Sequence, residues 1–349
     1  AASRAIAVRQ RVDGTNNLYG KNLALTTRGG SIEVATQTQT VQNGTTVATQ
    51  VGPRAAIVAS ESLTLNAAKD INVKGGTVSA GKDLVLNAGN AIDIGTITTT
   101  EASASKTKQG RTTTTSASTS TTNIGSNLSA GGNLVLKSGG STTITGSNIN
   151  AAGDAAIVAG GVVTIAAATD TSSSKTTEKY SGVFQKRTTT TTVDTATNVG
   201  SNVTTGGSLY VKSGGDTNIT GGSQIKAGGD VVVDTSGNNL NILAGNDKTT
   251  TVVDSKKSGF GVGGGLYGSE SVRTTDKETR NVSSGIAAGG QLALVNNKNV
   301  TIQGSNVSAD KGWLIQATND VNILAGADTS EVTSHKETSC ILCVTSSSS

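Results

Sequence analysis

Apolar residues recur along the chain in pairs separated by one residue, and these pairs return at a fixed spacing. Leu63 and Leu65 are followed after five residues by Ile71 and Val73, and the same arrangement returns 21 residues later from Leu84. Nine such units are present, two of them with one extra residue in the middle. They begin at Leu23, Leu63, Leu84, Leu134, Ala155, Leu209, Val231, Leu292 and Trp313. A sequence period of about 20 residues is typical of a solenoid.

The spacing within a unit predicts short β-strands, because the side chains of a strand alternate between its two faces. A third apolar position follows most units after a short gap, for example at Val78, Ile149, Ile225 and Val307. The residues between these positions are rich in Gly, Asn, Ser and Asp, which suit tight bends. The predicted fold class is therefore all-β, a three-sided parallel β-helix with 21 residues per turn. The usual chirality of β crossovers predicts a right-handed helix.

The connection between the second and third strand of a turn is short in some turns and long in others. Long inserts rich in Thr and Ser leave this same corner on every second turn, and we interpret them as β-hairpin arms. The arms are expected at about residues 35–56, 95–127, 166–202, 243–285 and 324–349. Because turns stack about 4.8 Å apart, arms on alternate turns emerge about 9.6 Å apart, which is the width of one hairpin. The arms can then merge into a second sheet beside the helix.

The repeat frame occupies nearly the whole chain, so we expect residues 1–349 to form a single β-helix domain. The chain begins without Met, shows no signal peptide, and ends before the fifth insert returns. It contains no apolar stretch of about 18 residues that could span a membrane. These features lead us to expect a segment of a larger protein.

The net charge of +4 reflects a mild excess of basic residues. This excess lies in the inserts, at Lys106, Lys108, Arg111, Lys186, Arg187, Lys256, Lys257, Arg273, Lys277 and Arg280. Two interpretations remain open, namely attraction to anionic cell surfaces or polysaccharide, and protection of strand edges against aggregation. Aromatic residues do not alternate with these cations, so nucleic acid is not an expected partner.

Two short motifs carry candidate chemistry. Cys340 and Cys343 form a CxxC pair five residues after the only histidine, His335. A zinc site needs further Cys or His ligands, and a redox centre normally opens a helix, so we expect a local disulfide or two ordinary strand residues. The glycines of Gly259–Gly264 match a dinucleotide fingerprint in form only, because no helix and no acidic partner follow them. We expect a hairpin tip at that position.

Polar residues also recur at the corners of the repeat. Single aspartates stand before the first strand of four turns, at Asp83, Asp154, Asp230 and Asp310. Glycosidases need clustered carboxylates, so we interpret these separate aspartates as caps of the corners. A Gly-Ser-Asn sequence precedes the third strand of several turns, which predicts a ladder of amides. Its members are Asn127, Asn148, Asn202 and Asn306. The sequence therefore predicts no catalytic, cofactor-binding or metal-binding residue and no small-molecule substrate.

Three elements recur together in this chain: Gly-Gly-(Asn/Ser/Asp)-Leu strands, Gly-Ser-Asn-Ile/Val corners, and Asp-Thr-Ser inserts at Asp170 and Asp328. In combination they resemble the haemagglutinin repeats of filamentous-haemagglutinin-like exoproteins. The resemblance extends over about residues 20–335. It implies a β-helical filament segment rather than an enzyme, and a β-helix polysaccharide-active enzyme is the remote alternative.

The resemblance also implies how such a protein is exported and used. It implies two-partner secretion from a Gram-negative bacterium, with an outer-membrane transporter that recognises regions outside this chain. The product is a secreted filament on the cell surface, either the stalk of a contact-dependent growth inhibition effector that delivers a toxin or the shaft of an adhesin. We take the stalk as the leading expectation and the arms as the expected contact with a target-cell surface or outer membrane.

Overall fold

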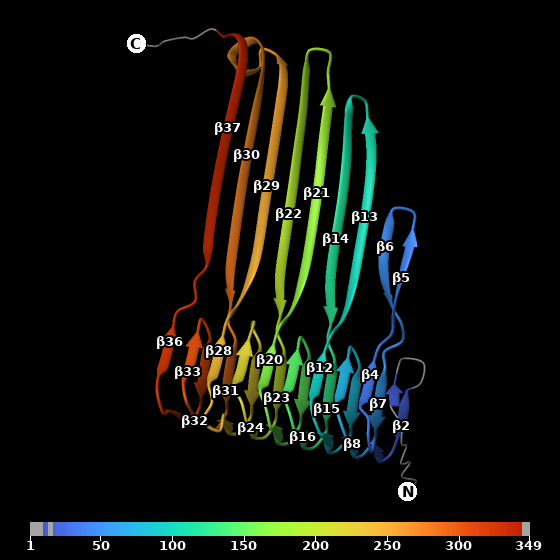
Figure 1. The fold of residues 1–349 in the computed structure, drawn as a ribbon, viewed down its shortest axis with the longest axis vertical. Helices are drawn as coiled ribbons and strands as arrows, with labels where there is room; N and C mark the ends of the chain where they lie inside the picture. Colours follow the sequence, from blue (N-terminus) through green and yellow to red (C-terminus); the bar gives the residue numbers. More distant parts are fainter. Residues whose placement is uncertain (1–9, 13–16, 344–349) are drawn as a thin grey trace.

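The computed structural model describes residues 10–12 and 17–343 of the chain, and its main body is a solenoid of three parallel sheets (Figure 1). Each turn contributes one strand to each sheet, as the 21-residue repeat predicts. The first sheet contains β3 (Leu23–Thr26), β8 (Leu63–Ala67), β11 (Leu84–Ala88), β16 (Leu134–Ser138), β19 (Ala155–Ala159), β24 (Leu209–Ser213), β27 (Val231–Asp234), β32 (Gln291–Asn297) and β35 (Gly312–Ala317). These strands are the first halves of the nine repeat units.

The second and third sheets complete the three-sided cross-section. The second contains β1 (Gln10–Val12), β4 (Ile32–Ala35), β9 (Ile71–Lys74), β12 (Ile92–Gly95), β17 (Thr142–Thr145), β20 (Val163–Ala166), β25 (Thr217–Thr220), β28 (Leu240–Leu243), β33 (Val300–Gln303) and β36 (Val321–Leu324). The third contains β2 (Leu18–Gly20), β7 (Ala56–Ala59), β10 (Thr77–Ala80), β15 (Asn127–Ala130), β18 (Asn148–Ala151), β23 (Asn202–Thr205), β26 (Gln224–Ala227), β31 (Gly285–Ala288) and β34 (Asn306–Ala309). The predicted parallel β-helix is thus confirmed.

Like side chains stack over like along the inside of the solenoid. Leu65 pairs with Leu86 and Val73 with Ile94 in the parallel register that the repeat predicts. All four side chains are fully buried. Burial of one aliphatic side chain of this size contributes about 1.5–3 kcal/mol, so the stacked columns supply the main stabilisation of each turn.

Two turns carry a hydroxyl where the repeat has an apolar residue. Thr142 and Thr217 are fully buried, and their hydroxyls lie 2.9 and 2.8 Å from those of Ser138 and Ser213. Each serine hydroxyl also donates to a backbone carbonyl two residues further on. Because each hydroxyl has a partner, these polar groups are accommodated inside the core.

Nearly all of the described chain is extended. The one helical element among the described residues is a 3-10 turn, η1 (Val262–Gly264). Among the residues that the structure describes, no helix is long and apolar enough to cross a membrane.

Candidate functional site: the arm sheet

The long inserts form four hairpins and one single strand, and together they build a fourth sheet (Figure 1). Its strands are β5 (Thr38–Asn43), β6 (Thr46–Val51), β13 (Ile97–Gln109), β14 (Thr112–Ile124), β21 (Ala168–Ser181), β22 (Gln185–Val199), β29 (Gly245–Phe260), β30 (Gly265–Val282) and β37 (Thr329–Cys343). They follow one another in chain order and pair antiparallel throughout, so the hairpins merge as expected. Residues 344–349 of the fifth expected arm lie outside the described residues. We call this fourth sheet the arm sheet.

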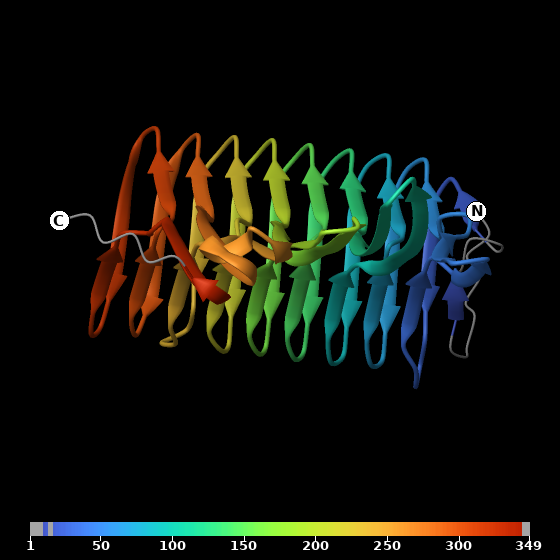
Figure 2. The same ribbon diagram turned by 90° about the horizontal axis from the view of Figure 1, so that it is seen from above.

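The arm sheet is a single layer that stands upright on the solenoid. Figure 2 shows it from above, rising over the middle of the solenoid's width. Along the described chain, neither view shows an element covering one of its faces. Its strands lengthen from six residues in β5 to eighteen in β30. The arms therefore present both faces of one extended β-sheet to solvent.

A column of buried serines closes the base of the arms. Its members, all fully buried, are Ser126, Ser147, Ser201, Ser223 and Ser284. The Ser201 hydroxyl lies 2.7 Å from the carbonyl oxygen of Ala166, the last residue of β20, which precedes the third arm. Ser126 contacts Gly95 at the second arm and Ser284 contacts Leu243 at the fourth in the same way. The serine that follows each of these arms thus bonds the strand that precedes it.

A repeated contact between Asp and Asn joins neighbouring arms. The backbone N–H of Asn123 donates to Asp170 at 2.7 Å, and that of Asn198 donates to Asp247 at 2.7 Å. Asn281 and Asp328 make the same contact at 2.6 Å. Each Asn lies where one arm returns and each Asp where the next arm leaves. This contact gives a physical role to the Asp-Thr-Ser inserts and to the shared return sequences.

The two faces of the arm sheet carry opposite net charge. Directly paired residues of neighbouring strands lie on the same face, and successive residues of one strand lie on opposite faces. One face, here called the basic face, carries nine cations against four carboxylates, Asp194, Asp254, Glu331 and Glu337. The cations are Lys106, Lys108, Lys175, Lys179, Lys186, Lys248, Lys256, Arg273 and Lys277. All nine are exposed.

The opposite face carries seven carboxylates against four cations. The carboxylates are Glu101, Asp170, Glu178, Asp247, Glu270, Asp276 and Glu278. The cations are Arg187, Lys257, Arg280 and Lys336. Of the ten basic residues noted in the sequence, six therefore lie on the basic face, three lie on the opposite face, and Arg111 lies in the turn between β13 and β14. Sequence reasoning missed Lys175, Lys179 and Lys248, which the strand registers place on the basic face.

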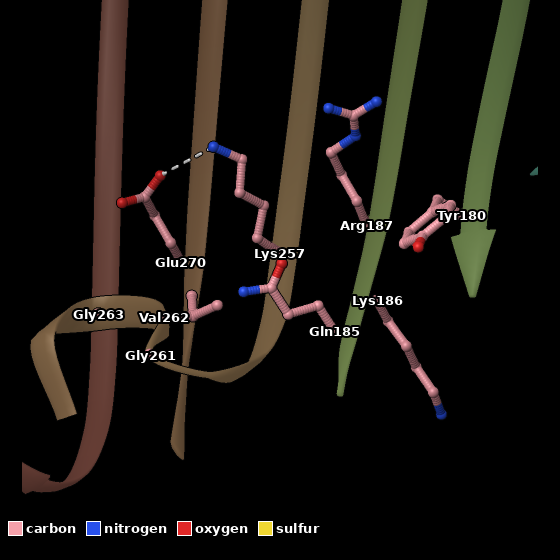
Figure 3. A pocket seen from close by; sticks show the side chains of 9 residues that line it. All are labelled: Tyr180, Gln185, Lys186, Arg187, Lys257, Gly261, Val262, Gly263 and Glu270. Atoms are coloured by element: carbon pink, nitrogen blue, oxygen red, sulfur yellow. Dashed lines mark ion pairs between the residues drawn. The ribbon is translucent and has the colours of Figure 1, made fainter. Parts of the chain in front are cut away.

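A hollow of about 590 Å³ lies near the tips of the third and fourth arms, on the opposite face (Figure 3). One row across the sheet lines it, consisting of Tyr180, Arg187, Lys257 and Glu270, with the η1 loop beside it. Glu270 is paired with Lys336 at 3.0 Å and with Lys257 at 3.9 Å. The hydrogen bond and charge of Lys336 hold the pKa of the Glu270 carboxyl below its ordinary value, and the charge of Lys257 acts in the same direction. The hollow thus carries an ion-paired carboxylate rather than a free acid.

An apolar cluster occupies the extreme tips. Four of the seven aromatic residues of the chain are here, and Phe260 contacts both Phe184 and Tyr267 edge-on at 5.9 and 5.7 Å. Phe184 is 67% exposed and Leu342 is 74% exposed. Exposed apolar side chains with no role in the solenoid core are thus gathered at one end of the arms, namely those of Tyr180, Val183, Phe184, Phe260, Leu266, Tyr267, Ile341 and Leu342.

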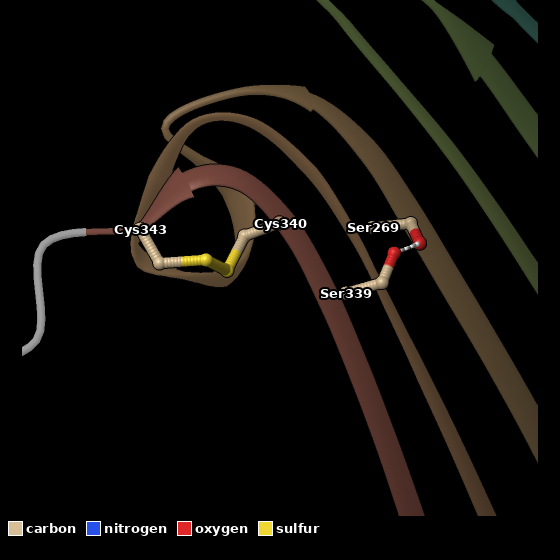
Figure 4. Close-up of a disulfide and its surroundings, with 4 residues drawn as sticks. All are labelled: Ser269, Ser339, Cys340 and Cys343. Atoms are coloured by element: carbon tan, nitrogen blue, oxygen red, sulfur yellow. Dashed lines mark hydrogen bonds between the residues drawn. A yellow bond between two sulfur atoms is a disulfide. The ribbon is translucent and has the colours of Figure 1, made fainter.

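Cys340 and Cys343 form a disulfide at the end of β37, next to this cluster (Figure 4). The local disulfide is thus the correct one of the two alternatives. Cys340 is paired with Gly268 of β30 across the sheet. A Cβ added to Gly268 would meet the carbonyl oxygens of Val262 and Ser339 at 2.4 and 2.5 Å. Gly261, Gly263 and Gly264 have φ near +75°, +72° and +80°, which explains the glycine run as tip geometry. Within the described chain, no group of three or more His, Cys, Asp and Glu residues could hold a metal ion.

The predicted corner caps hold for three of the four aspartates. Asp83, Asp154 and Asp230 accept hydrogen bonds at 2.7–2.8 Å from backbone N–H groups of the next turn. Asp310 does not belong to this column, because β35 begins with Gly312 paired to Gln291 and Asp310 lies two residues earlier. Carboxylates bound to backbone in this way are spread along the solenoid one per corner. They do not form the carboxylate pair that glycoside hydrolysis requires.

The predicted amide ladder is shorter than expected. The side chain of Asn148 donates to Asn127 at 3.3 Å, and that of Asn202 donates to Asn148 at 3.1 Å. Asn306 is not part of this ladder, because Gln224 and then Gly285 occupy the two intervening turns. Glycine has no side-chain amide that could continue the ladder, which explains the interruption.

These observations define a class of protein, a β-solenoid whose alternate turns extend hairpin arms into a continuous flanking sheet. A family model described as Hemagglutinin repeat matches the chain at residues 30–114, 108–185, 182–270 and 265–342. The chain therefore belongs to the hemagglutinin-repeat family. The last three matches each run from near one arm tip to near the next, so the family's repeat consists of two turns and two arm strands. No curated protein and no solved structure matches the chain.

Proposed function

We propose that this chain is a structural and contact segment of a secreted bacterial surface filament. The observation that carries the proposal is the pairing of a repeat-built rod of this family with one uninterrupted arm sheet along its length. Each turn contacts only its neighbours, so a chain that emerges from a secretion pore can fold turn by turn without waiting for distant residues. The solenoid gives the filament its length, and the arm sheet gives it a contact surface.

Within this role, we propose that the filament is the stalk of a contact-dependent growth inhibition effector. Its partners are then an outer-membrane two-partner secretion transporter, which acts on regions outside this chain, and the surface or outer membrane of a target cell, which the arms contact. The shaft of a filamentous adhesin is the alternative, and it shares the same rod and the same exposed arm sheet. The scattered and backbone-bound carboxylates of the solenoid favour both of these over a polysaccharide-active enzyme.

The test removes the arms and leaves the rod. Each hairpin of the full-length protein is replaced by the short connection that this chain uses at residues 75–76, which joins the second and third sheets directly. We expect unchanged thermal unfolding of the solenoid and unchanged display on the cell surface, together with loss of target-cell inhibition in mixed culture. Inhibition that survives loss of the arms would refute the contact role.

The same cells distinguish the two kinds of filament. A stalk predicts that the armless protein fails to inhibit its target, and that deletion of the sequence downstream of this chain abolishes inhibition while the cells still adhere. An adhesin predicts that adherence depends on the arms and that no inhibition occurs with either protein.

A further inference from the structure

The basic face is left largely without counter-charges of its own. Two of its nine cations have ion-pair partners, Arg273 with Asp254 at 3.9 Å and Lys277 with Glu331 at 3.4 Å. The other seven cations have no ion pair among the described residues. On the opposite face, by contrast, Lys257 and Lys336 are both held by Glu270. The basic face therefore presents a net positive charge to solvent, whereas the opposite face, on which Arg187 and Arg280 also have no ion pair among the described residues, carries a net negative charge.

We propose that the basic face binds a linear acidic polysaccharide. This inference rests on the proposed role of the arm sheet as the contact surface of the filament. Lys108, Lys179 and Lys256 lie in one row across five neighbouring strands, so the first and last are about 19 Å apart. Thr113 and Thr188 stand between them in the same row and offer hydroxyl groups. A row of alternating cations and hydroxyls matches a polymer that carries a repeated anion and many hydroxyls.

The shape of the face favours a polymer over a small ligand. The cations are distributed from Lys248 near the arm base to Lys186 near the tip rather than gathered around one pocket. Each added anionic unit of a polymer meets a further cation, so many weak exposed contacts add up, although each is worth little alone.

An acidic polysaccharide also fits better than a membrane surface. The cations extend over the full height of the arms, whereas a bilayer that is touched by the apolar tip around Phe184 and Leu342 would meet only the last rows. Bases of a nucleic acid would need aromatic platforms among the cations, and the rows between β13 and β29 contain Thr and Ser there instead.

The test measures binding of the 349-residue chain to polygalacturonate, a linear polymer of uronic acid, with neutral dextran as the control polymer. The first variant removes one row of the basic face: Lys108→Gln, Lys179→Gln and Lys256→Gln. A matched variant removes the same charge from the opposite face: Arg187→Gln, Lys257→Gln and Arg280→Gln. We expect the first variant to lose affinity by roughly tenfold or more near 0.15 M salt, and the second by less than about twofold.

Four results would overturn the proposal. They are equal losses in the two variants, binding to dextran as tight as to polygalacturonate, affinity independent of salt, and binding to phosphatidylglycerol vesicles without binding to polygalacturonate. All six substituted side chains are exposed, so circular dichroism of both variants should match the parent.

The same pair of variants keeps this proposal separate from the proposed function. If the chain binds polygalacturonate through the basic face but armless cells still inhibit or adhere, the contact role fails and the binding site stands. If armless cells lose function but neither triple variant changes polymer binding, the contact role stands and the acidic polysaccharide is wrong.

Discussion

Removal of a single turn should disrupt the arm sheet while leaving the solenoid core intact. Deletion of residues 127–147 joins Ser126 to Asn148 and preserves a Gly-Ser-Asn corner at the junction. β10, β11 and β12 would then stack directly against β18, β19 and β20, with Ile94 over Ile165. The solenoid therefore loses one turn without any mismatch of its buried columns.

The arm sheet, however, cannot keep its strand pairing after the deletion. The second and third arms are two turns apart, which gives about 9.6 Å for the two strands of one hairpin, and the deletion halves that distance to about 4.8 Å. One strand then has no place in the layer. The ten residue pairs between Thr112–Thr121 of β14 and Thr171–Tyr180 of β21 are the ones at risk. At about 1 kcal/mol for each backbone hydrogen bond, roughly 10 kcal/mol of arm pairing depends on this spacing.

Hydrogen exchange resolved by residue is the appropriate measurement. We expect amides of β14 and β21 to lose protection in the deletion variant, while amides of β12 and β20 in the solenoid keep it. The matched control deletes one whole repeat, residues 123–197, so that Thr122 joins Asn198 at the equivalent position of the next arm. In the control, β14 runs in the same direction as the strand it replaces, so it can pair with β29 and should stay protected.

Equal protection of β14 in the two deletion variants would refute the reasoning. That result would mean that arm spacing is not imposed by the turns and that the arm sheet can shift freely on the solenoid. Loss of protection in both variants would likewise contradict it, because the control preserves the two-turn spacing.

Three smaller changes test the base, the tip and the charge of the arms. Ser201→Ala removes a buried acceptor of a backbone N–H and should cost about 2 kcal/mol in urea unfolding. Ser129→Ala, at a half-buried position of β15 whose side chain alternates with the buried Leu128 and Ala130, should cost less than about 0.5 kcal/mol. Reduction of the Cys340–Cys343 disulfide should raise exchange at the tip amides and leave the solenoid unchanged. The lowered pKa of Glu270 means that its ion pairs contribute above pH 4.5 and are lost as the pH falls through the folded-state value. Carboxyl NMR should place that value below 4.5, and Lys336→Gln should raise it.

The solenoid could be predicted because its buried apolar residues recur at a fixed spacing in the sequence. Leu84, Leu86, Ile92 and Ile94 lie where the 21-residue frame places them, all fully buried. The pairing of turns was predictable as well, because the inserts interrupt the frame at one corner on every second turn. The stacking of buried side chains depends only on residues one turn apart, which the repeat holds in register.

The charge asymmetry of the arms was harder to predict, because it depends on strand registers that no period encodes. Arg187 and Lys186 are adjacent in the sequence, yet they lie on opposite faces of the arm sheet. Recognising this requires the exact hairpin turns, since a shift by one residue would exchange the two faces. The contact between Asn198 and Asp247 joins residues 49 positions apart on different arms. The predictions for Asn306 and Asp310 were wrong for a related reason. Gln224 and Gly285 separate Asn306 from Asn202, and Gly312 rather than Asp310 occupies the position that continues the column of Asp230.

The common strand spacing of the solenoid and the arm sheet explains why the arms occur on alternate turns. Every turn adds one strand to each solenoid sheet, and every second turn adds a two-stranded hairpin, so the arm sheet also gains one strand per turn. Both structures advance about 4.8 Å per strand, and neither strains the other however many repeats are joined. Each repeat also carries further cations onto the basic face, as Lys175, Lys179 and Lys186 do in the third arm. Affinity for a long anionic polymer should then rise with the number of repeats, because each additional arm binds at the high effective concentration created by the first.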